Sequence, residues 1–189
     1  MSPMRVISGK AKGRKLRLVP GLSTRPITDR VKESLFNILR MDITNCKFLD
    51  LFAGTGSVGI EALSRGAGYV RFIDLNRRAI QTIRENLKDV GLEEDCEVFQ
   101  MDALAMLSRT PDSRFDYVYV APPQYKEIWI ETIRVLDKTP DWLVDDGWVI
   151  VQIDPREYED VELINFSEFD QRKYGNTLLV FYEREVHSD

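Results

Sequence analysis

The segment Asp-Leu-Phe-Ala-Gly-Thr-Gly at 50–56 places an acid and two glycines directly after a short apolar run. Glycine tolerates the positive φ angles of a sharp turn, and a helix that begins after the turn directs its backbone N–H groups at a ligand. With Gly59 the spacing is also G-x-G-x-x-G, which cradles a dinucleotide pyrophosphate. The carboxylate of Asp50 would repel a pyrophosphate, but it can accept from an ammonium group directly or through water. The turn therefore favours a cationic guest, such as the methionine moiety of S-adenosylmethionine.

Two further acids follow the next two predicted strands. Asp74 comes 20 residues after Gly54, the position from which a carboxylate accepts from both hydroxyls of a ribose. Asp102, followed by Ala103, offers an acceptor for the amine of an adenine. Each acid alone is also explained as a helix N-cap or a solvated turn residue. NAD shares the ribose requirement, but the ordered set of three favours S-adenosylmethionine as cofactor. A nicotinamide oxidoreductase is an alternative on the glycine spacing alone.

The fourth predicted strand ends in Ala-Pro-Pro-Gln-Tyr at 121–125. Paired prolines at a strand end fix backbone carbonyls so that they point into a cleft, although Pro-Pro alone is also an ordinary turn terminator. The segment resembles the Asp/Asn-Pro-Pro-Tyr/Phe signature of amino-group methyltransferases. In that signature the polar side chain and the first proline carbonyl accept from the target amine, and the aromatic stacks on the base. The expected catalytic set is Ala121, Pro122, Pro123, Gln124 and Tyr125.

These residues require a sheet that brings strand ends together. From residue 47 onward, short apolar runs alternate with helix-period stretches, which predicts a parallel sheet covered by helices on both faces. The expected strands are 47–53, 69–75, 97–101, 115–120 and 147–153, and the expected helices are 57–65, 77–90 and 126–137. Segments 161–169 and 177–184 have no helix between them and predict a C-terminal antiparallel edge hairpin. The expected fold is α/β, a Rossmann-like class I methyltransferase with a mostly parallel seven-stranded sheet.

A basic arm precedes the sheet. Residues 1–40 hold ten Lys or Arg against two acids, whereas the whole chain has a net charge of −5. Segments 4–8 and 15–19 suggest a small hairpin, and Thr28 offers an N-cap for a helix that ends at Leu39. Such an arm would grip a polyanion. A solvated arm without a partner explains the charge equally well.

Several classes of protein are disfavoured by composition. His187 is the single histidine, so a histidine metal cluster or a serine-histidine triad cannot be built. No apolar run approaches the roughly 20 residues that cross a bilayer, and the first residues lack the apolar core of a signal peptide. We expect a cytoplasmic monomer without a metal and without a membrane partner.

Four segments together resemble the RsmD family, bacterial 16S ribosomal RNA guanine-N2 methyltransferases: RVISGKAKGR at 5–14, TRPITDRVKESLFNIL at 24–39, DLFAGTG at 50–56 and GIEALSRGA at 59–67. The likeness covers nearly the whole chain, and its first two segments are more specific than any glycine motif. It implies methyl transfer from S-adenosylmethionine to the exocyclic N2 of a guanine, guanine 966, in 16S rRNA of the small ribosomal subunit.

The resemblance also implies roles for the arm. Residues 1–40 would contact RNA and close over the cofactor, and residues 41–189 would form the methyltransferase domain. The RNA-contacting set is Arg5, Lys10, Lys12, Arg14, Lys15 and Arg17. The cofactor-binding set is Thr24, Arg25, Pro26, Thr28, Phe36, Asp50, Phe52, Gly54, Gly56, Asp74, Leu75, Asp102 and Ala103.

The fourth-strand motif departs from the family pattern. Ala121 replaces Asp or Asn and Gln124 replaces the aromatic, so Ala121 cannot accept through its side chain. The backbone carbonyls at 121 and 122 and Oε1 of Gln124 are the substitute acceptors, and Tyr125 is the substitute stacking face. A slow enzyme, a rewired enzyme and a catalytically weakened module that binds cofactor and RNA in ribosome assembly are all compatible with this pattern. A methyltransferase for proteins or small molecules would leave the basic arm unused.

Overall fold

The computed structural model describes residues 4–21, 27–125 and 127–186. Its α-helices are α1 (Asp29–Leu39), α2 (Ser57–Ser64), α3 (Arg77–Val90), α4 (Ala103–Leu107) and α5 (Ile128–Lys138). Its strands are β1 (Lys47–Leu51), β2 (Tyr69–Asp74), β3 (Cys96–Gln100), β4 (Phe115–Val120), β5 (Leu143–Ile153), β6 (Phe166–Tyr174) and β7 (Thr177–Arg184). Three short 3-10 helices, η1 (Arg40–Ile43), η2 (Pro140–Trp142) and η3 (Pro155–Glu157), complete the described elements.

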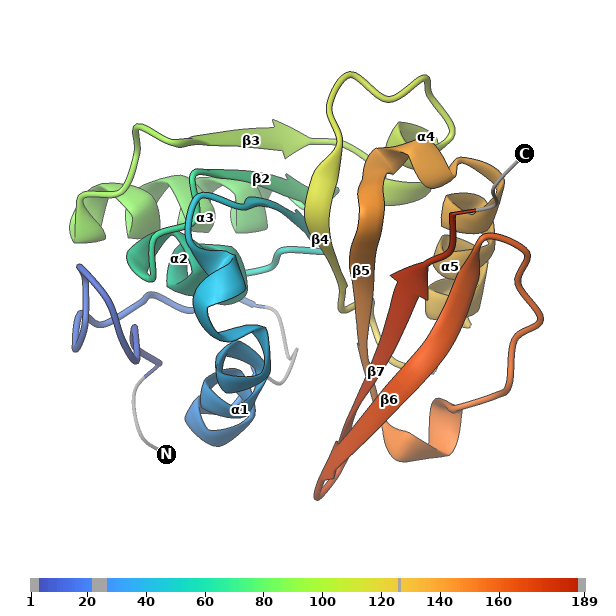
Figure 1. Cartoon of the computed structure of the whole chain (residues 1–189). Coiled ribbons are helices and arrows are strands. Elements are labelled where there is room, and N and C mark those ends of the chain that lie inside the picture. Colours follow the sequence, from blue (N-terminus) through green and yellow to red (C-terminus); the bar gives the residue numbers. More distant parts are fainter. Residues whose placement is uncertain (1–3, 22–26, 126, 187–189) are drawn as a thin grey trace.

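The strands form one sheet in the order β3-β2-β1-β4-β5-β7-β6 (Figure 1). The first five strands in this order are parallel, and β7 pairs antiparallel with both β5 and β6. The chain order reverses between β1 and β4, so this pair is the topological switch point at which α/β sheets bind ligands. The predicted mostly parallel seven-stranded sheet with an edge hairpin is confirmed.

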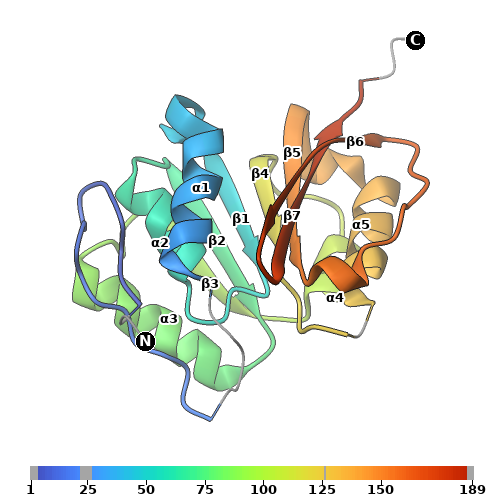
Figure 2. The same cartoon turned by 90° about the horizontal axis from the view of Figure 1, so that it is seen from below.

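Helices cover both faces of the sheet, as the apolar runs of the strands predicted. Helices α1, α2 and α3 lie on one face, and α4 and α5 lie on the other (Figure 2). Alternate residues of a strand enter the two cores: Phe48 packs with the first group of helices, and Leu49 and Leu51 pack with the second. The arm contributes Val6, Ala11 and Leu16 to the first of these cores.

The N-terminal hairpin is smaller than expected. A single antiparallel bridge joins Arg5 and Lys15 in place of two strands. The reason is that neighbouring backbone N–H groups donate to side chains of α2: those of Ile7 and Ser8 donate to Glu61, and that of Ala11 donates to Ser64. These donors are unavailable to a strand partner.

The predicted strand 161–169 is also displaced, because β6 begins only at Phe166. The side chain of Asp137 accepts from the backbone N–H groups of Ile164 and Asn165, at 3.0 and 2.7 Å, and so holds this segment as a loop. The hairpin turn at Gly175 and the end of α3 at Gly91 (φ 71°) agree with the sequence. Helix α4 was not predicted.

No helix in the described ranges is long and apolar enough to span a membrane.

Candidate active site

The glycine turn lies between β1 and α2, at the switch point of the sheet. Phe52, Gly54 and Gly56 all have positive φ, at 59°, 57° and 76°. Gly59 serves packing instead, since a Cβ there would lie 2.3 Å from the ring of Phe72 on β2. The turn is therefore tight, and it brings the start of α2 against the carboxyl ends of the strands.

Asp50 joins the end of β1 to the start of α2 through a buried hydrogen bond. Its side chain is buried, with 1% of the residue exposed, and Oδ2 accepts from the backbone N–H of Gly59 at 3.0 Å. Burial raises the pKa of this carboxyl well above its ordinary value, and the negative charge of Asp74 raises it further. The hydrogen bond to Gly59 was not predicted. Contact of Asp50 with a ligand ammonium stays a prediction.

Asp74 fastens the turn from the neighbouring strand. Oδ2 accepts from the N–H of Gly54 at 2.8 Å, and Oδ1 accepts from the N–H of Asn76 at 2.8 Å. Asn76 in turn caps the N-terminus of α3. Leu75, between them, is 66% exposed, so an apolar side chain faces solvent directly beside the carboxylate. An acid and an exposed apolar side chain at one strand end suit the ribose and the base of a nucleoside.

Asp102 follows β3 at the same edge of the sheet and caps α4, where its Oδ1 accepts from the N–H of Ala105 at 2.8 Å. The helix-cap explanation of this acid is thus present in the structure, and a contact with adenine is untested. Ala103 is buried under the first turn of α4. The three acids do gather at the ends of adjacent strands, because β3, β2 and β1 are neighbours.

The fourth-strand motif lies beside this turn, since Leu51 of β1 is paired with Val120 of β4. Ala121 is partly buried, Pro122 is buried, and Pro123 and Gln124 are exposed. Within the described residues, the side chain of Gln124 has no hydrogen-bond partner. Its assignment as a substitute acceptor therefore stays a prediction.

Tyr125 is fixed by contacts with the segment that follows β5. Its φ is 60° and the residue is 59% exposed. The backbone N–H donates to Glu157 Oε1 at 2.6 Å, and the hydroxyl hydrogen-bonds with Asp154 Oδ2 at 3.0 Å. The guanidinium of Arg156 lies 5.5 Å from the ring centroid. Three residues of the segment that follows β5 therefore fix the position of Tyr125.

The segment 154–157 was not predicted as part of the site, although it carries a sequence signal. Asp-Pro-Arg-Glu at 154–157 has an N-cap acid, a proline at the first position and a glutamate at the third, which is the spacing of a capping box. The structure contains that capping box. Arg156 also holds the pKa of Asp154 below its usual range through hydrogen bonds to the carboxylate.

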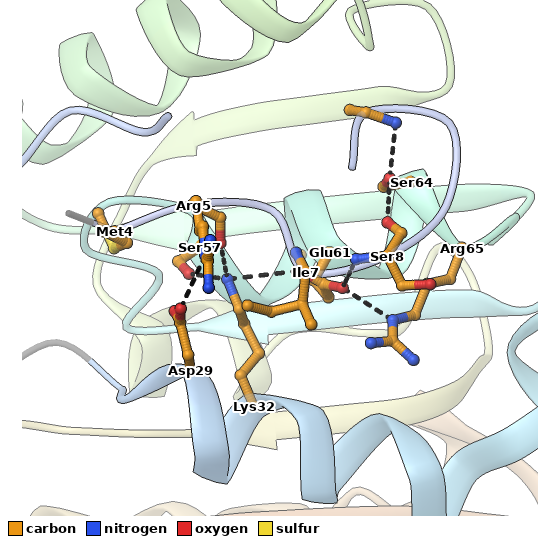
Figure 3. Close-up of polar contacts among 12 residues, drawn as sticks. Met4, Arg5, Ile7, Ser8, Asp29, Lys32, Ser57, Glu61, Ser64 and Arg65 are labelled. Atoms are coloured by element: carbon orange, nitrogen blue, oxygen red, sulfur yellow. Dashed lines mark hydrogen bonds and ion pairs between the residues drawn. The ribbon is translucent and has the colours of Figure 1, made fainter. Parts of the chain in front are cut away.

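The basic arm is joined to the domain by buried charges (Figure 3). Lys32 of α1 is fully buried, and its Nζ donates to the carbonyl of Arg5 at 2.6 Å and to Ser57 Oγ at 3.0 Å. The same Nζ lies 3.4 Å from Oε2 of Glu61, which is also fully buried. Lys32 therefore connects α1 to the first residues of the arm and to the first residue of α2.

The six arm cations assigned to RNA fall into two groups. Three have acidic or carbonyl partners: Arg5 pairs with Asp29, and Arg14 and Arg17 both contact Asp89 of α3. The other three are exposed, and no side-chain partner is found for them in the described part of the chain: Lys10, Lys12 and Lys15.

The part of the arm that the resemblance expects to close over the cofactor is only partly described. Thr24, Arg25 and Pro26 lie outside the described residues. Thr28 accepts from the N–H of Val31 at 3.4 Å and begins α1 as predicted. Phe36 is 1% exposed and stacks on Phe48, with the guanidinium of Arg65 5.0 Å from its ring centroid. Its contacts are therefore core contacts, and a contact with the cofactor is untested.

The residues at this edge fit a nucleoside cofactor with a positive charge. The turn is held by two carboxylates, and one exposed apolar side chain flanks them. Among the described residues, no group of three or more His, Cys, Asp or Glu could hold a metal ion.

Comparisons with known proteins agree with this geometry. Residues 4–183 match the family model described as "Conserved hypothetical protein 95". The chain is 39% identical over 184 residues to the "Putative rRNA methyltransferase YlbH" of Bacillus subtilis, an alignment that covers 96% of this chain and 99% of the relative. It is 32% identical over 188 residues to the "Ribosomal RNA small subunit methyltransferase D" of Escherichia coli K12, covering 98% and 92%.

A solved structure, the "Putative methyltransferase yhhF from Escherichia coli", superposes with a TM-score of 0.86 at 32% identity. The superposition covers 96% of this chain and 98% of that one.

Proposed function

Because the chain belongs to the RsmD family of ribosomal RNA methyltransferases, we propose that it transfers a methyl group from S-adenosylmethionine to the exocyclic N2 of a guanine in 16S rRNA. By the family pattern the target is guanine 966. Its partner is then the small ribosomal subunit or the free RNA. The nicotinamide alternative is set aside, since it rested on the glycine spacing alone.

One observation carries the proposal: the two carboxylates that fix the glycine turn lie beside the paired prolines at the switch point. Asp74 accepts from the backbone N–H of Gly54 in the turn, and Asp50 accepts from the backbone N–H of Gly59 in the first turn of α2. The loop after β4 begins next to them, because Val120 and Leu51 are paired. A cofactor held on the turn would therefore present its reactive group to the carbonyls of that loop.

When bound, the cofactor supplies an electrophilic sulfonium methyl. The chain's own task is to hold a weak nucleophile, because the lone pair of a guanine amine is delocalised into the ring. The backbone carbonyls of Ala121 and Pro122 accept the amine hydrogens and so direct the lone pair outward. Positioning of this kind supplies most of the rate, and no strong general base is required.

The test is transfer of tritiated methyl groups to small subunits from cells that lack the chain. We expect label in 16S rRNA with the wild type and a large loss with Asp74→Ala. Asp112→Ala is the matched control, because Asp112 is an exposed acid paired with Arg71 away from this edge. Wild-type activity in both Asp50→Ala and Asp74→Ala would contradict the proposed cleft. Sequencing of the labelled RNA would check the position and the N2 atom.

The departure at the fourth strand favours a second candidate, a catalytically weakened module that binds the cofactor and RNA. Ala121 has no side-chain acceptor, and loss of one oriented acceptor costs about 2 to 4 kcal/mol in a transition state. The second candidate predicts that S-adenosylhomocysteine and RNA both bind without transfer of label. The methylation state of ribosomal RNA from cells with and without the chain separates the two.

A further inference from the structure

We propose that Arg156 and Tyr125 together bind the guanine base that receives the methyl group, which makes Arg156 a specificity-determining residue from the segment after β5. The inference rests on the proposed function and names a base contact that the fourth-strand motif lacks. Where the family pattern has an aromatic at position 124, this chain has an exposed glutamine.

The first support is the way the pair is held. Arg156 donates from Nε to Asp154 Oδ1 at 3.0 Å and from Nη2 to Asp154 Oδ2 at 2.9 Å. The same Nη2 contacts the hydroxyl of Tyr125 at 2.5 Å. Asp154 itself is 4% exposed and is fixed as the N-cap of η3. A buried acid thus sets the orientation of a surface arginine and of the tyrosine ring together.

The second support is exposure. The side chain of Arg156 is 75% exposed even though two of its three nitrogens are engaged. No partner of its Nη1 is found in the described part of the chain. Tyr125 is 59% exposed, and its left-handed φ is maintained by the contact of its N–H with Glu157. The ring of Tyr125 and the guanidinium of Arg156 are therefore both exposed to solvent, and their hydrogen bonds hold them together.

The third support is location. Tyr125 lies in the loop that begins at Ala121, and Arg156 follows β5, the parallel neighbour of β4. Both lie at the edge where the glycine turn would hold the cofactor. Unpaired bases of RNA are bound by stacking on aromatic rings and on guanidinium planes. The remaining donor of Arg156, Nη1, can pair with the O6 and N7 acceptors of guanine, whereas adenine offers an amine at the O6 position. The chemistry therefore selects guanine.

The experiment measures kcat/KM for methyl transfer to under-methylated small subunits, together with the affinity for S-adenosylhomocysteine by calorimetry. We expect Arg156→Ala to lower kcat/KM at least about fivefold, as loss of a base contact does, with the affinity for S-adenosylhomocysteine unchanged. Arg156→Lys keeps the charge but not the plane, and we expect it to be nearly as impaired. Tyr125→Ala combined with Arg156→Ala should cost less than the sum of the two single effects in free energy, because the pair acts as one unit.

Arg114→Ala is the matched control. Arg114 is an exposed arginine paired with Asp141 just before β4, at the opposite edge of the sheet. Full activity of Arg156→Ala or of Arg156→Lys would overturn the inference while leaving the proposed function intact. An equal loss of cofactor affinity in Arg156→Ala would overturn it as well. Absence of label with the wild type would overturn the proposed function, and the inference with it.

Discussion

At the residue scale, the two carboxylates of the glycine turn differ in burial and in the number of backbone N–H groups that they accept from. Asp50 is buried and bonds Gly59, whereas Asp74 is half-buried and bonds both Gly54 and Asn76. The sequence predicted both acids at strand ends from their spacing. It could not predict their backbone partners, because these contacts depend on the left-handed angles of the turn and on where the following helices begin.

A stability prediction follows for Asp50. Asp50→Ala should lower the free energy of unfolding by about 1 to 3 kcal/mol, because the buried N–H of Gly59 loses its acceptor. Asp50→Asn keeps an acceptor of nearly the same shape and should cost less. Urea denaturation of the two variants beside the wild type measures the difference. Equal stability of Asp50→Ala and the wild type would contradict a stabilising role of the hydrogen bond to Gly59.

The two thiols give a prediction for chemical modification. Burial raises the pKa of Cys46 to about 12 and the pKa of Cys96 to about 11. Only the thiolate is nucleophilic, and a raised pKa means that very little thiolate is present at pH 8. We expect both to resist iodoacetamide at pH 8 in the folded protein and to react in urea. Mass spectrometry of native samples would refute this if either thiol were modified within minutes.

At the element scale, whether the sequence predicted a strand or helix depends on where its burial and its backbone hydrogen-bond partners come from. The central parallel strands were predicted because both of their faces are buried and their apolar runs are continuous, as in 117–120 of β4. The arm and the start of β6 were misjudged because their backbone donors are taken by distant acids, Glu61 and Asp137. Contacts across 53 to 54 residues leave no local pattern in a sequence. The same reason explains why the partners of Tyr125 were missed.

The anchoring of the arm is testable at this scale. Glu61 accepts from the N–H groups of Ile7 and Ser8 and pairs with Lys32 and Arg65. Removing one partner of a buried pair costs about 3 to 5 kcal/mol because it leaves an uncompensated charge. We therefore expect Glu61→Ala to lower stability by that amount and to accelerate hydrogen exchange in residues 4–20.

Glu97→Ala is the control for this variant, since the side chain of Glu97 is 47% exposed and its buried partner Arg71 keeps a second acid, Asp112. Its stability and its exchange in residues 4–20 should stay close to the wild type. Unchanged protection of the arm in Glu61→Ala would show that the apolar contacts of Val6 and Leu16 are sufficient to hold it.

At the scale of the whole molecule, charge is separated between the arm and the rest of the chain. Residues 1–40 carry an excess of basic charge, while the net charge of the chain is −5. The structure reduces the number of arm cations available to a polyanion, because Arg5 already pairs with Asp29 of the arm itself, and Arg14 and Arg17 already contact Asp89 of the domain. The partner-free lysines of the arm are the stronger candidates for phosphate contacts.

The last prediction concerns these lysines and the salt dependence of RNA binding. Each phosphate contact contributes about 0.7 to 0.9 to the slope of log K against log salt concentration. Combined Lys10→Ala, Lys12→Ala and Lys15→Ala should therefore reduce the slope by roughly 2 to 3. Arg17→Ala should reduce it much less, because Asp89 and Glu85 already offset that charge.

These slopes are measured from the affinity for a 16S rRNA fragment at about four salt concentrations between 50 and 200 mM. The control replaces three exposed lysines outside the arm with alanine, Lys47, Lys138 and Lys173, which matches the change in net charge. If net charge alone governed binding, the two triple variants would lose the same slope, and the arm would have no special role. A larger loss in the arm variant is the expected result, because phosphate contacts are local and are screened beyond about 10 Å at 0.1 M salt.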